Sequence, residues 1–418
     1  GGPDAAPLGQ ALRRMPTLEP GGARLDLGGH DGGAEDSDRG GPGRGLLGLY
    51  NVIVGNLVLS SFLISIPFGF LSHHWDWPKW AVFTCNFFAV LPMAWLIGKS
   101  TEDLSSQTGE AAGGLLNATF GNVVEMLLCV AGIRAGELAV VQCTLVGSIL
   151  SNMLLVLGTA LLWGGYNNPP PKKMQYSRVG AGSQSTLMIL AVLGVALPTV
   201  HGMLSTRTGE LLALSRGCSI ILFLLYIQFL LFQLRTHKEA FEGPADEDAE
   251  DEEPDMDATT ATAVLAVCTV LTTFCSEFLI GAIEGTIESW NVSKEFIGIV
   301  VLPIIGNAAE HYTAIVVAGQ NKMDLSLGVA VGSSCQMALM VTPFTVLAGW
   351  ALDSPVSLDF HPFQAIVLLL AVLLVTNVLK DGECNWLEGS MLCTAYGAIA
   401  LIYYFEGGAG ALTGGVDA

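Results

Sequence analysis

Long runs of apolar residues dominate the chain and limit what it can fold into. At least eleven runs are long enough, or nearly long enough, to cross the roughly 30 Å hydrocarbon core of a bilayer. Helices satisfy the backbone hydrogen bonds of such segments internally, and the ten-residue alternating strands of a membrane β-barrel do not appear. The sequence therefore predicts an all-α integral membrane protein. Its approximate spans are 47–71, 79–98, 115–133, 138–164, 185–203, 217–234, 260–287, 296–319, 325–350, 362–379 and 386–405.

The composition supports the membrane assignment. Of 418 residues, 51% are hydrophobic and 13% are charged, whereas a soluble protein carries about a quarter charged residues. The nine cysteines include no CxxC pair and lie almost entirely in apolar runs, so we expect small buried side chains and no metal cluster. The expected partner is the lipid bilayer.

The net charge of −20 is concentrated in one segment. Between Glu242 and Asp257 there are ten acidic residues and no basic ones, and nothing in the chain favours nucleic-acid binding. If the N-terminus lies in the cytosol, thirteen Lys and Arg residues fall on the cytosolic side and five on the other. The positive-inside rule therefore predicts a cytosolic N-terminus and a cytosolic acidic segment.

Two short motifs recur with the same spacing. Gly121-Asn122-x-x-Glu125 matches Gly306-Asn307-x-x-Glu310 at an offset of 185 residues, and the Gly-Ser pair at 147–148 matches the pair at 332–333 at the same offset. The motifs lie on the third and eighth predicted spans, and an odd number of steps between two spans reverses their direction. The sequence thus predicts an inverted repeat, in which transport sites typically lie at the repeat interface near the midplane.

The repeat divides the chain into predicted regions. They are a disordered N-terminal tail (1–45), a first transmembrane helix (46–72), a first five-helix repeat (78–236), an acidic cytosolic linker or helix (237–258), a second five-helix repeat (259–406) and a C-terminal tail (407–418).

The repeated motifs place polar side chains in the middle of apolar spans. In each motif Asn and Glu are three residues apart, so they share a helix face. A carboxylate at this depth is costly unless it meets a partner or water, and carboxylate and amide oxygens suit a hard cation such as Ca²⁺. We therefore predict that Glu125 and Glu310 bind the cation and protons, assisted by Asn122 and Asn307. Pro303 could break the second motif helix and free carbonyl oxygens.

Other residues are candidates for a supporting or pathway role. The Gly-Ser runs on the partner spans can serve close helix packing or line the site, and the sequence favours neither role. His311 could tune the carboxylate of Glu310 or carry protons, or it could serve only in packing. Acidic residues in the second and seventh spans could pass ions toward the site or simply be solvated at helix ends. The candidates are Gly121, Gly306, Ser148, Ser151, Ser333, Gln336, Glu102, Glu284 and His311.

The motif sequences resemble those of a known family. "GLLNATFGNVVEMLL", "GSILSNMLLVLG", "GIVVLPIIGNAAEH" and "VAVGSSCQMAL" are similar to the two repeat signatures of the cation/proton exchangers, the Ca²⁺/H⁺ antiporters of vacuoles and bacteria. The resemblance covers about residues 47–406. It implies eleven spans, a site between the third and eighth spans, and Glu125 and Glu310 as carriers of the cation and protons. Val123 and Val124 depart from it, because smaller residues are common there.

The expected function is exchange of Ca²⁺, with Mn²⁺ or other divalent cations as further substrates, for protons. Such exchange would move Ca²⁺ from the cytosol into an acidic compartment such as the vacuole. An alternative is a Na⁺/Ca²⁺-type exchanger, but such exchangers usually carry Pro directly before the acidic residue, where Val124 and Ala309 stand here. A channel is a further possibility. An intramembrane hydrolase would need HExxH, GxSxG or paired Asp motifs, which are missing. No cofactor is expected, and the sequence leaves a homo-oligomer open.

Overall fold

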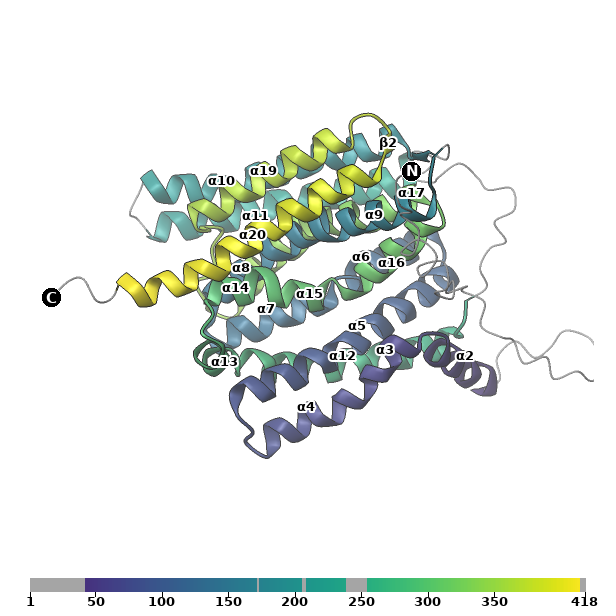
Figure 1. The fold of residues 1–418 in the computed structure, drawn as a ribbon, viewed down its shortest axis with the longest axis horizontal. Coiled ribbons are helices and arrows are strands. Elements are labelled where there is room, and N and C mark those ends of the chain that lie inside the picture. The colour runs from purple at the N-terminus through teal and green to yellow at the C-terminus, as the bar shows by residue number, and fades with distance from the viewer. Residues whose placement is uncertain (1–41, 171–172, 205–207, 238–253, 414–418) are drawn as a thin grey trace, which may run out of the picture.

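The computed structural model describes residues 42–170, 173–204, 208–237 and 254–413. Nearly all of them are helical, and the helices form one elongated bundle (Figure 1). Most of the predicted N-terminal tail and of the acidic linker lies outside these residues. At the two ends helix extends further than expected, because α2 begins at Pro42 and α20 runs to Thr413.

The elements before the linker cover the first six predicted spans. They are α2 (Pro42–Gly55), α3 (Leu57–Ser61), the 3-10 helix η1 (Phe62–Ile64), α4 (Ser65–His74), α5 (Lys79–Thr108), α6 (Glu110–Phe120), α7 (Val123–Ala135), α8 (Leu138–Leu150), the π-helix η2 (Ser151–Val156), α9 (Leu157–Asn167), β1 (Met174–Gln175), α10 (Arg178–Leu204), α11 (Thr208–Leu231) and the π-helix η3 (Phe232–Thr236).

The elements after the linker cover the other five predicted spans. They are α12 (Ala258–Ile280), α13 (Ile283–Trp290), α14 (Lys294–Phe296), the π-helix η5 (Ile297–Val301), α15 (Leu302–Gly306), α16 (Ala308–Gly319), α17 (Met323–Gln336), the π-helix η6 (Met337–Val341), α18 (Thr342–Ala351), α19 (Pro362–Val378), β2 (Glu383–Cys384) and α20 (Trp386–Thr413).

The lengths of the helices support a membrane protein but not a count of eleven. Within the described residues, seven continuous helices are long and apolar enough to cross a membrane. An eighth span results if α14–α15 and α16 are taken together, although they are bent by 58°. The other predicted spans correspond to helices that are shorter, broken or less apolar, among them α6–α7 and α19.

Both repeated motifs coincide with helix breaks that we did not predict. α6 ends at Phe120 and α7 starts at Val123, while α15 ends at Gly306 and α16 starts at Ala308. The expectation that Pro303 breaks the helix is wrong, because the chain stays helical through this residue. The π-helix η5 widens the turn just before Pro303, and the break comes four residues later at Asn307.

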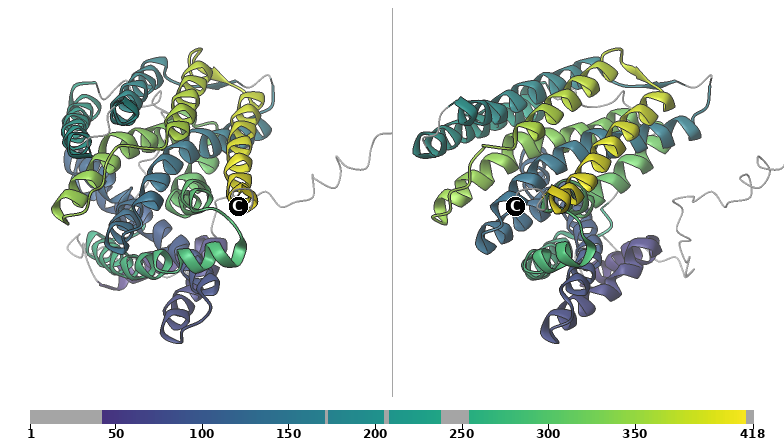
Figure 2. Two further views of the ribbon diagram at one scale, coloured as in Figure 1. Left: turned by 90° about the vertical axis from the view of Figure 1, so that its left-hand side faces the viewer. Right: turned by 60° about the vertical axis from the view of Figure 1, so that its left-hand side comes forward.

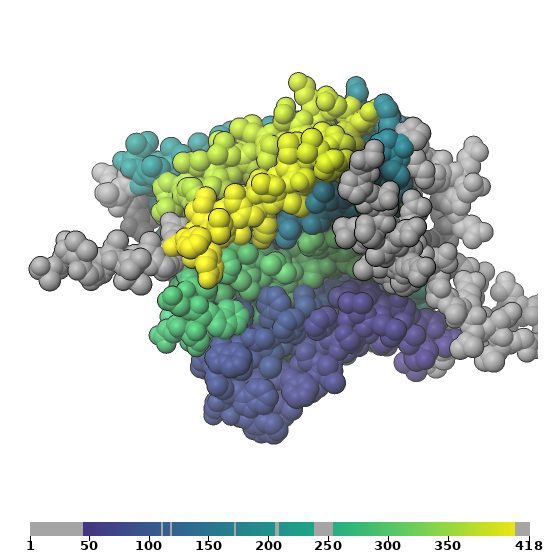
Figure 3. Space-filling view, viewed as in Figure 1, coloured from purple at the N-terminus to yellow at the C-terminus, as the bar shows by residue number. Residues whose placement is uncertain are grey.

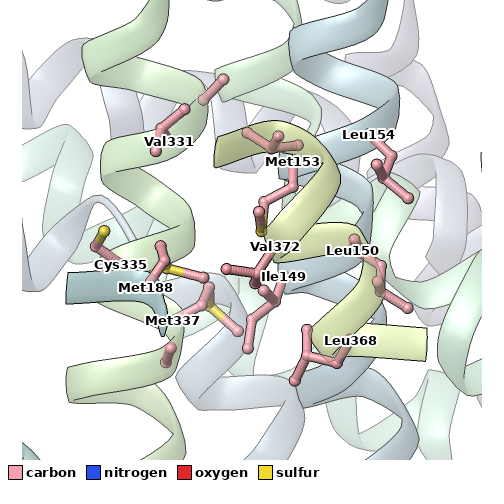
Figure 4. Packing of buried hydrophobic residues seen from close by; sticks show 14 of the residues in the cluster. Ile149, Leu150, Met153, Leu154, Met188, Val331, Cys335, Met337, Leu368 and Val372 are labelled. Atoms are coloured by element: carbon pink, nitrogen blue, oxygen red, sulfur yellow. The ribbon is translucent and has the colours of Figure 1, made fainter. Parts of the chain in front are cut away.

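Two hydrophobic clusters form the interior. The smaller one joins α5 and α12 with parts of α2 and α13, and the larger one joins α8–α11 with α17–α20. Figure 2 shows α4 and α10–α11 on opposite sides of the bundle, and Figure 3 shows α2–α5 as a continuous lower mass. Figure 4 shows the centre of the larger cluster, where Ile149 and Met153 lie among Met188, Met337 and Val372.

The two motif helices lie between these clusters. On α7, Val124 and Leu128 belong to the smaller cluster, whereas Cys129 belongs to the larger one. Along the second motif helix, Leu302 belongs to the smaller cluster and Ile299 to the larger one. The polar motif residues are therefore held where the two apolar cores meet.

Glycines bring α8 and η5 into close contact next to the motifs. A Cβ atom added to Gly298 would lie 2.5 Å from the Cβ of Cys143 and 3.2 Å from the carbonyl oxygen of Val140. A Cβ on Gly147 would lie 2.4 Å from the carbonyl oxygen of Ile299. Only glycine permits this approach, which is typical of helix packing in membranes.

The described end of the acidic linker is anchored to α5. Lys99 forms ion pairs with Asp103 at 3.1 Å and Asp255 at 2.9 Å, and the Asp103 carboxylate accepts a hydrogen bond from the backbone N–H of Met256 at 3.0 Å. Asp257 then caps α12. Hydrogen bonds to its carboxylate hold the pKa of Asp257 below its usual value, and the one donated by the Thr260 hydroxyl contributes most. We call this end of the bundle the linker end.

We predict that Gly298→Leu destabilises the bundle. The added side chain would overlap Cys143 and the backbone of α8, and overpacking of this kind costs about 1–3 kcal/mol. The control is Gly397→Leu, because a Cβ there meets no atom within 4 Å. Thermal unfolding of the solubilised protein should give a lower midpoint for Gly298→Leu alone. Equal midpoints for both variants would contradict the packing described for α8 and η5.

Candidate functional site

The Asn residues of the two motifs reach toward helices of the opposite half of the chain. The Asn122 side chain donates a hydrogen bond to the Gln336 side chain at the end of α17. The Asn307 side chain donates to the backbone carbonyl of Ser148 on α8 at 3.1 Å. Both Asn residues are 1% exposed, and Asn122 stands at the start of α7 while Asn307 stands at the start of α16. The two breaks therefore have reciprocal partners.

The first carboxylate lies directly against the second motif. A Cβ added to Gly306 would come within 3.0 Å of Glu125 Oε1 and 3.2 Å of its Cγ. Glu125 is 1% exposed. Glycine at 306 thus lets the backbone of one motif approach the carboxylate of the other, and any side chain there would push this carboxylate aside by a few tenths of an ångström.

The two carboxylates come from neighbouring backbone segments. Glu125 lies against Gly306, and Glu310 follows Gly306 by four residues on the next helix. Two carboxylates placed in this way repel each other when both are ionised. Each lies in the first turn of its helix, α7 or α16, where the positive end of the helix dipole favours negative charge. Glu310 is half-buried, so the pair is not symmetric in its access to solvent.

Several buried oxygen atoms at the motifs have no hydrogen-bond partner among the described residues. Buried polar atoms are nearly always hydrogen-bonded in proteins, so a group of such atoms needs an explanation. Carboxylate, amide and hydroxyl oxygens are the ligands that Ca²⁺ prefers, and they can also be satisfied by protons or water. The atoms are both carboxylate oxygens of Glu125, Oε2 of Glu310, Oδ1 of Asn307, Oδ1 of Asn152 and Oγ of Ser148.

Of the predicted supporting residues on the partner helices, the three serines are buried and Gln336 is half-buried. Ser148 lies on α8, Ser151 begins η2, and Ser333 and Gln336 lie on α17. Gly121 lies in the first break, between α6 and α7, where a Cβ would lie 2.6 Å from the carbonyl oxygen of Asn117.

Two predicted pathway residues lie at exposed positions. The side chain of Glu284 on α13 is 73% exposed and is 3.2 Å from Lys294, which also pairs with Glu137. The side chain of Glu102 is 72% exposed and is 3.8 Å from Lys99. These contacts place each carboxylate in an exposed ion pair and do not bring it to the motifs.

His311 is turned toward α9. Its Nε2 atom is 2.8 Å from the hydroxyl oxygen of Thr159. That hydroxyl is also placed to donate to the backbone carbonyl of Leu155 at 2.7 Å, in which case it accepts from His311. The contact joins α16 to α9. Such a contact fits the packing role, which is one of the roles that the sequence leaves open for His311.

Asn152 is a further site candidate, which the sequence places with Ser148 and Ser151 on the fourth predicted span, where close helix packing and a site lining were equally open. It is 1% exposed on η2, and its side-chain oxygen has no hydrogen-bond partner in the described part of the chain. It follows Ser148 by four residues and so shares its helix face.

Together these features define a class of protein. It is a helical membrane protein with a pair of buried carboxylates between two chain segments that carry the same motif. The model of the sodium/calcium exchanger protein family matches residues 78–235 and 260–405. The chain belongs to this family.

Several vacuolar and cyanobacterial transporters are similar in sequence to this chain over most of its length. A vacuolar calcium ion transporter of Schizosaccharomyces pombe is 37% identical over 369 residues, covering 86% of this chain and 89% of the relative. Vacuolar cation/proton exchanger 2 of Arabidopsis thaliana is 39% identical over 357 residues, covering 81% and 80%. A Ca²⁺/H⁺ antiporter of Aphanothece halophytica is 38% identical over 366 residues, covering 84% and 97%.

Solved structures have the same fold. The structure of native YfkE matches with a TM-score of 0.72 at 31% identity and covers 82% of this chain and 99% of that one. The H⁺/Ca²⁺ exchanger CAX matches with a TM-score of 0.63 at 13% identity, which supports the fold alone.

We predict that Gly306→Ala weakens binding of the expected Ca²⁺. The new methyl group would contact the Glu125 carboxylate at 3.0 Å and displace it by a few tenths of an ångström, for which we expect roughly tenfold weaker binding. Gly328→Ala is the control, because a Cβ there meets no atom within 4 Å. The measurement is the half-saturating Ca²⁺ concentration of transport by protein of unchanged thermal stability. An unchanged value for Gly306→Ala would mean that this contact does not position the carboxylate.

Proposed function

We propose that this protein is a secondary transporter that exchanges Ca²⁺ for protons. The observation that carries the proposal is the pair Glu125 and Glu310, which comes from two matched motifs and lies among buried oxygens without hydrogen-bond partners. The relatives named as Ca²⁺/H⁺ antiporters and vacuolar cation/proton exchangers support the same activity. Mn²⁺ and other divalent cations are further candidate substrates.

The charge of the pair explains why one site can serve both substrates. Two neighbouring carboxylates out of water resist joint ionisation unless something neutralises them. One Ca²⁺ does so, and so do protons, whereas both together would leave excess positive charge. A site that is neutral in either loaded state, and faces each side of the membrane in turn, gives exchange rather than leak.

The layout proposed for this chemistry is an inverted repeat of five plus five spans after one N-terminal span. The family model supports it, because it matches residues 78–235 and 260–405 as two separate stretches. The reciprocal contacts of Asn122 with α17 and of Asn307 with α8 also support it. In this layout the acidic segment 237–258 joins the repeats.

The proposed direction of transport is from the cytosol into an acidic compartment. Relatives named as vacuolar transporters support a vacuolar membrane, and the distribution of Lys and Arg favours a cytosolic N-terminus. A higher proton concentration inside the compartment would drive Ca²⁺ inward. On this orientation the linker end of the bundle faces the cytosol.

We predict that Glu125→Gln and Glu310→Gln each abolish Ca²⁺ uptake driven by a pH gradient. Gln resembles a protonated Glu in shape, so both variants should fold. Each variant keeps only one carboxylate, whose single negative charge cannot balance the two positive charges of Ca²⁺. The control is Glu288→Gln, since Glu288 is exposed on α13. Uptake is measured in sealed vesicles with an acidic lumen, and in parallel with a Na⁺ gradient in place of the proton gradient.

Two outcomes would contradict the proposal. Wild-type uptake by correctly inserted Glu310→Gln protein would remove the carboxylate pair from the mechanism. Uptake driven by Na⁺ but not by protons would favour a Na⁺/Ca²⁺ exchanger instead.

We also predict that protons and Ca²⁺ compete for the same carboxylates. Burial and mutual repulsion favour the neutral forms of Glu125 and Glu310, so Ca²⁺ must displace protons in order to bind. Lower cytosolic pH should therefore raise the half-saturating Ca²⁺ concentration, and excess Ca²⁺ should restore the maximal rate. Initial uptake rates at several cytosolic pH values, with the membrane potential clamped, test this. A half-saturating concentration that does not depend on pH, in a protein that still exchanges protons, would mean separate sites.

A further inference from the structure

A groove lies between α10 and α11, on helices that carry neither repeated motif. It has a volume of about 770 Å³ and an open, mostly apolar lining to which Leu187, Leu190, Leu225, Phe229 and Phe232 contribute. Figure 2 shows α10 and α11 side by side at one corner of the bundle, on the side away from α4. Both helices are long and apolar enough to span a membrane, so this corner faces lipid.

The groove is charged at one end. Arg178 lines it at the first residue of α10, and Arg235 follows the lining residue Phe232 by three residues on η3. Both arginines are exposed. The N-terminus of α10 adds the positive end of a 27-residue helix at the same place. An anion is therefore favoured at this end of the groove.

The side chain of Arg178 is held in place, and its charge acts on Glu383 without forming an ion pair with it. A Cβ added to Gly382 would lie 2.5 Å from Cγ of Arg178 and 2.7 Å from its Nε, so the arginine lies directly on this glycine beside β2. Among the described residues no carboxylate is within ion-pair distance of Arg178, and the nearby Glu383 is engaged by Lys173 at 2.9 Å. An arginine fork that is positioned in this way suits a phosphate group.

The dimensions of the groove match one leaflet of a bilayer. From Arg178 to Leu190 the helix α10 rises by about 18 Å, at roughly 1.5 Å per residue. Half of the hydrocarbon core of a bilayer measures roughly 15 Å. The charged end therefore lies at headgroup depth when the apolar end lies near the middle of the membrane. Gln228, exposed on α11, adds one polar side chain to the lining.

From this charge, shape and depth we infer that the α10–α11 groove binds an anionic phospholipid of the leaflet at the linker end. The phosphate lies between Arg178 and Arg235, and an acyl chain lies along Leu187, Leu190 and Leu225. Basic pockets between transmembrane helices are known to recognise anionic headgroups in this way. Nothing in the proposed exchange reaction requires this site, so the two proposals stand separately.

Two substitutions test the groove by different means. Arg178→Ala removes the anion contact. Gly182→Leu fills the groove without a clash, because a Cβ at Gly182 meets no atom within 4 Å although the residue lines the groove. Gly217→Leu is the matched control, since this glycine of α11 also has no atom within 4 Å and lies outside the lining.

The experiment is native mass spectrometry of the full-length protein titrated with phosphatidylserine or phosphatidylcholine of the same acyl chains. Phosphatidylserine should bind the wild type and Gly217→Leu with higher occupancy than phosphatidylcholine. Its apparent affinity should fall about tenfold in Arg178→Ala, as expected for loss of one charge-assisted contact, and it should also fall in Gly182→Leu.

The same measurement can overturn the inference. Equal binding of both lipids by the wild type, or unchanged phosphatidylserine binding in both groove variants, would do so. A dimeric mass that is present in the wild type and lost in Gly182→Leu would show that a second copy of the chain occupies the groove instead.

Discussion

The contact between the Glu125 carboxylate and the backbone at Gly306 is the constraint on which the site depends. It brings a carboxylate from one motif to within van der Waals distance of the other, in a bundle whose interior is otherwise apolar. Burial of an ionised carboxylate without a partner is costly, so this arrangement must be balanced by something that the site binds. The helix breaks, the reciprocal Asn contacts and the glycine-mediated approach of α8 to η5 all keep the two motifs together.

Much of this could be predicted from the sequence, for identifiable reasons. Apolar runs predicted the helices, and the constant offset between the two motifs predicted that residues 121–125 and 306–310 belong to one site. The helix breaks were missed because apolar runs carry no sign of a local bend, although Gly-Asn is a common turn pair. The break attributed to Pro303 was wrong because a π-helical turn accommodates that proline.

Side-chain partners were the least predictable feature. Glu284 and Glu102 share the chemistry of the motif carboxylates, but they pair with Lys294 and Lys99 at exposed positions. His311 follows Glu310 directly in the chain, yet it faces Thr159 on another helix, since adjacent helical residues point in different directions. Sequence spacing says which residues share a face of one helix. Which helix packs against that face is decided by tertiary contacts.

The placement of the two carboxylates on different parts of the chain has a thermodynamic consequence. A cation held by both Glu125 and Glu310 acts as a non-covalent cross-link between segments 185 residues apart. Any ligand that binds only the folded state stabilises it in proportion to the logarithm of its concentration above the dissociation constant. In the proposed mechanism the transported ion is therefore also a structural element of its carrier. On that mechanism, each release of the ion removes one attachment across the interface between the two apolar cores, while the site changes the side of the membrane that it faces.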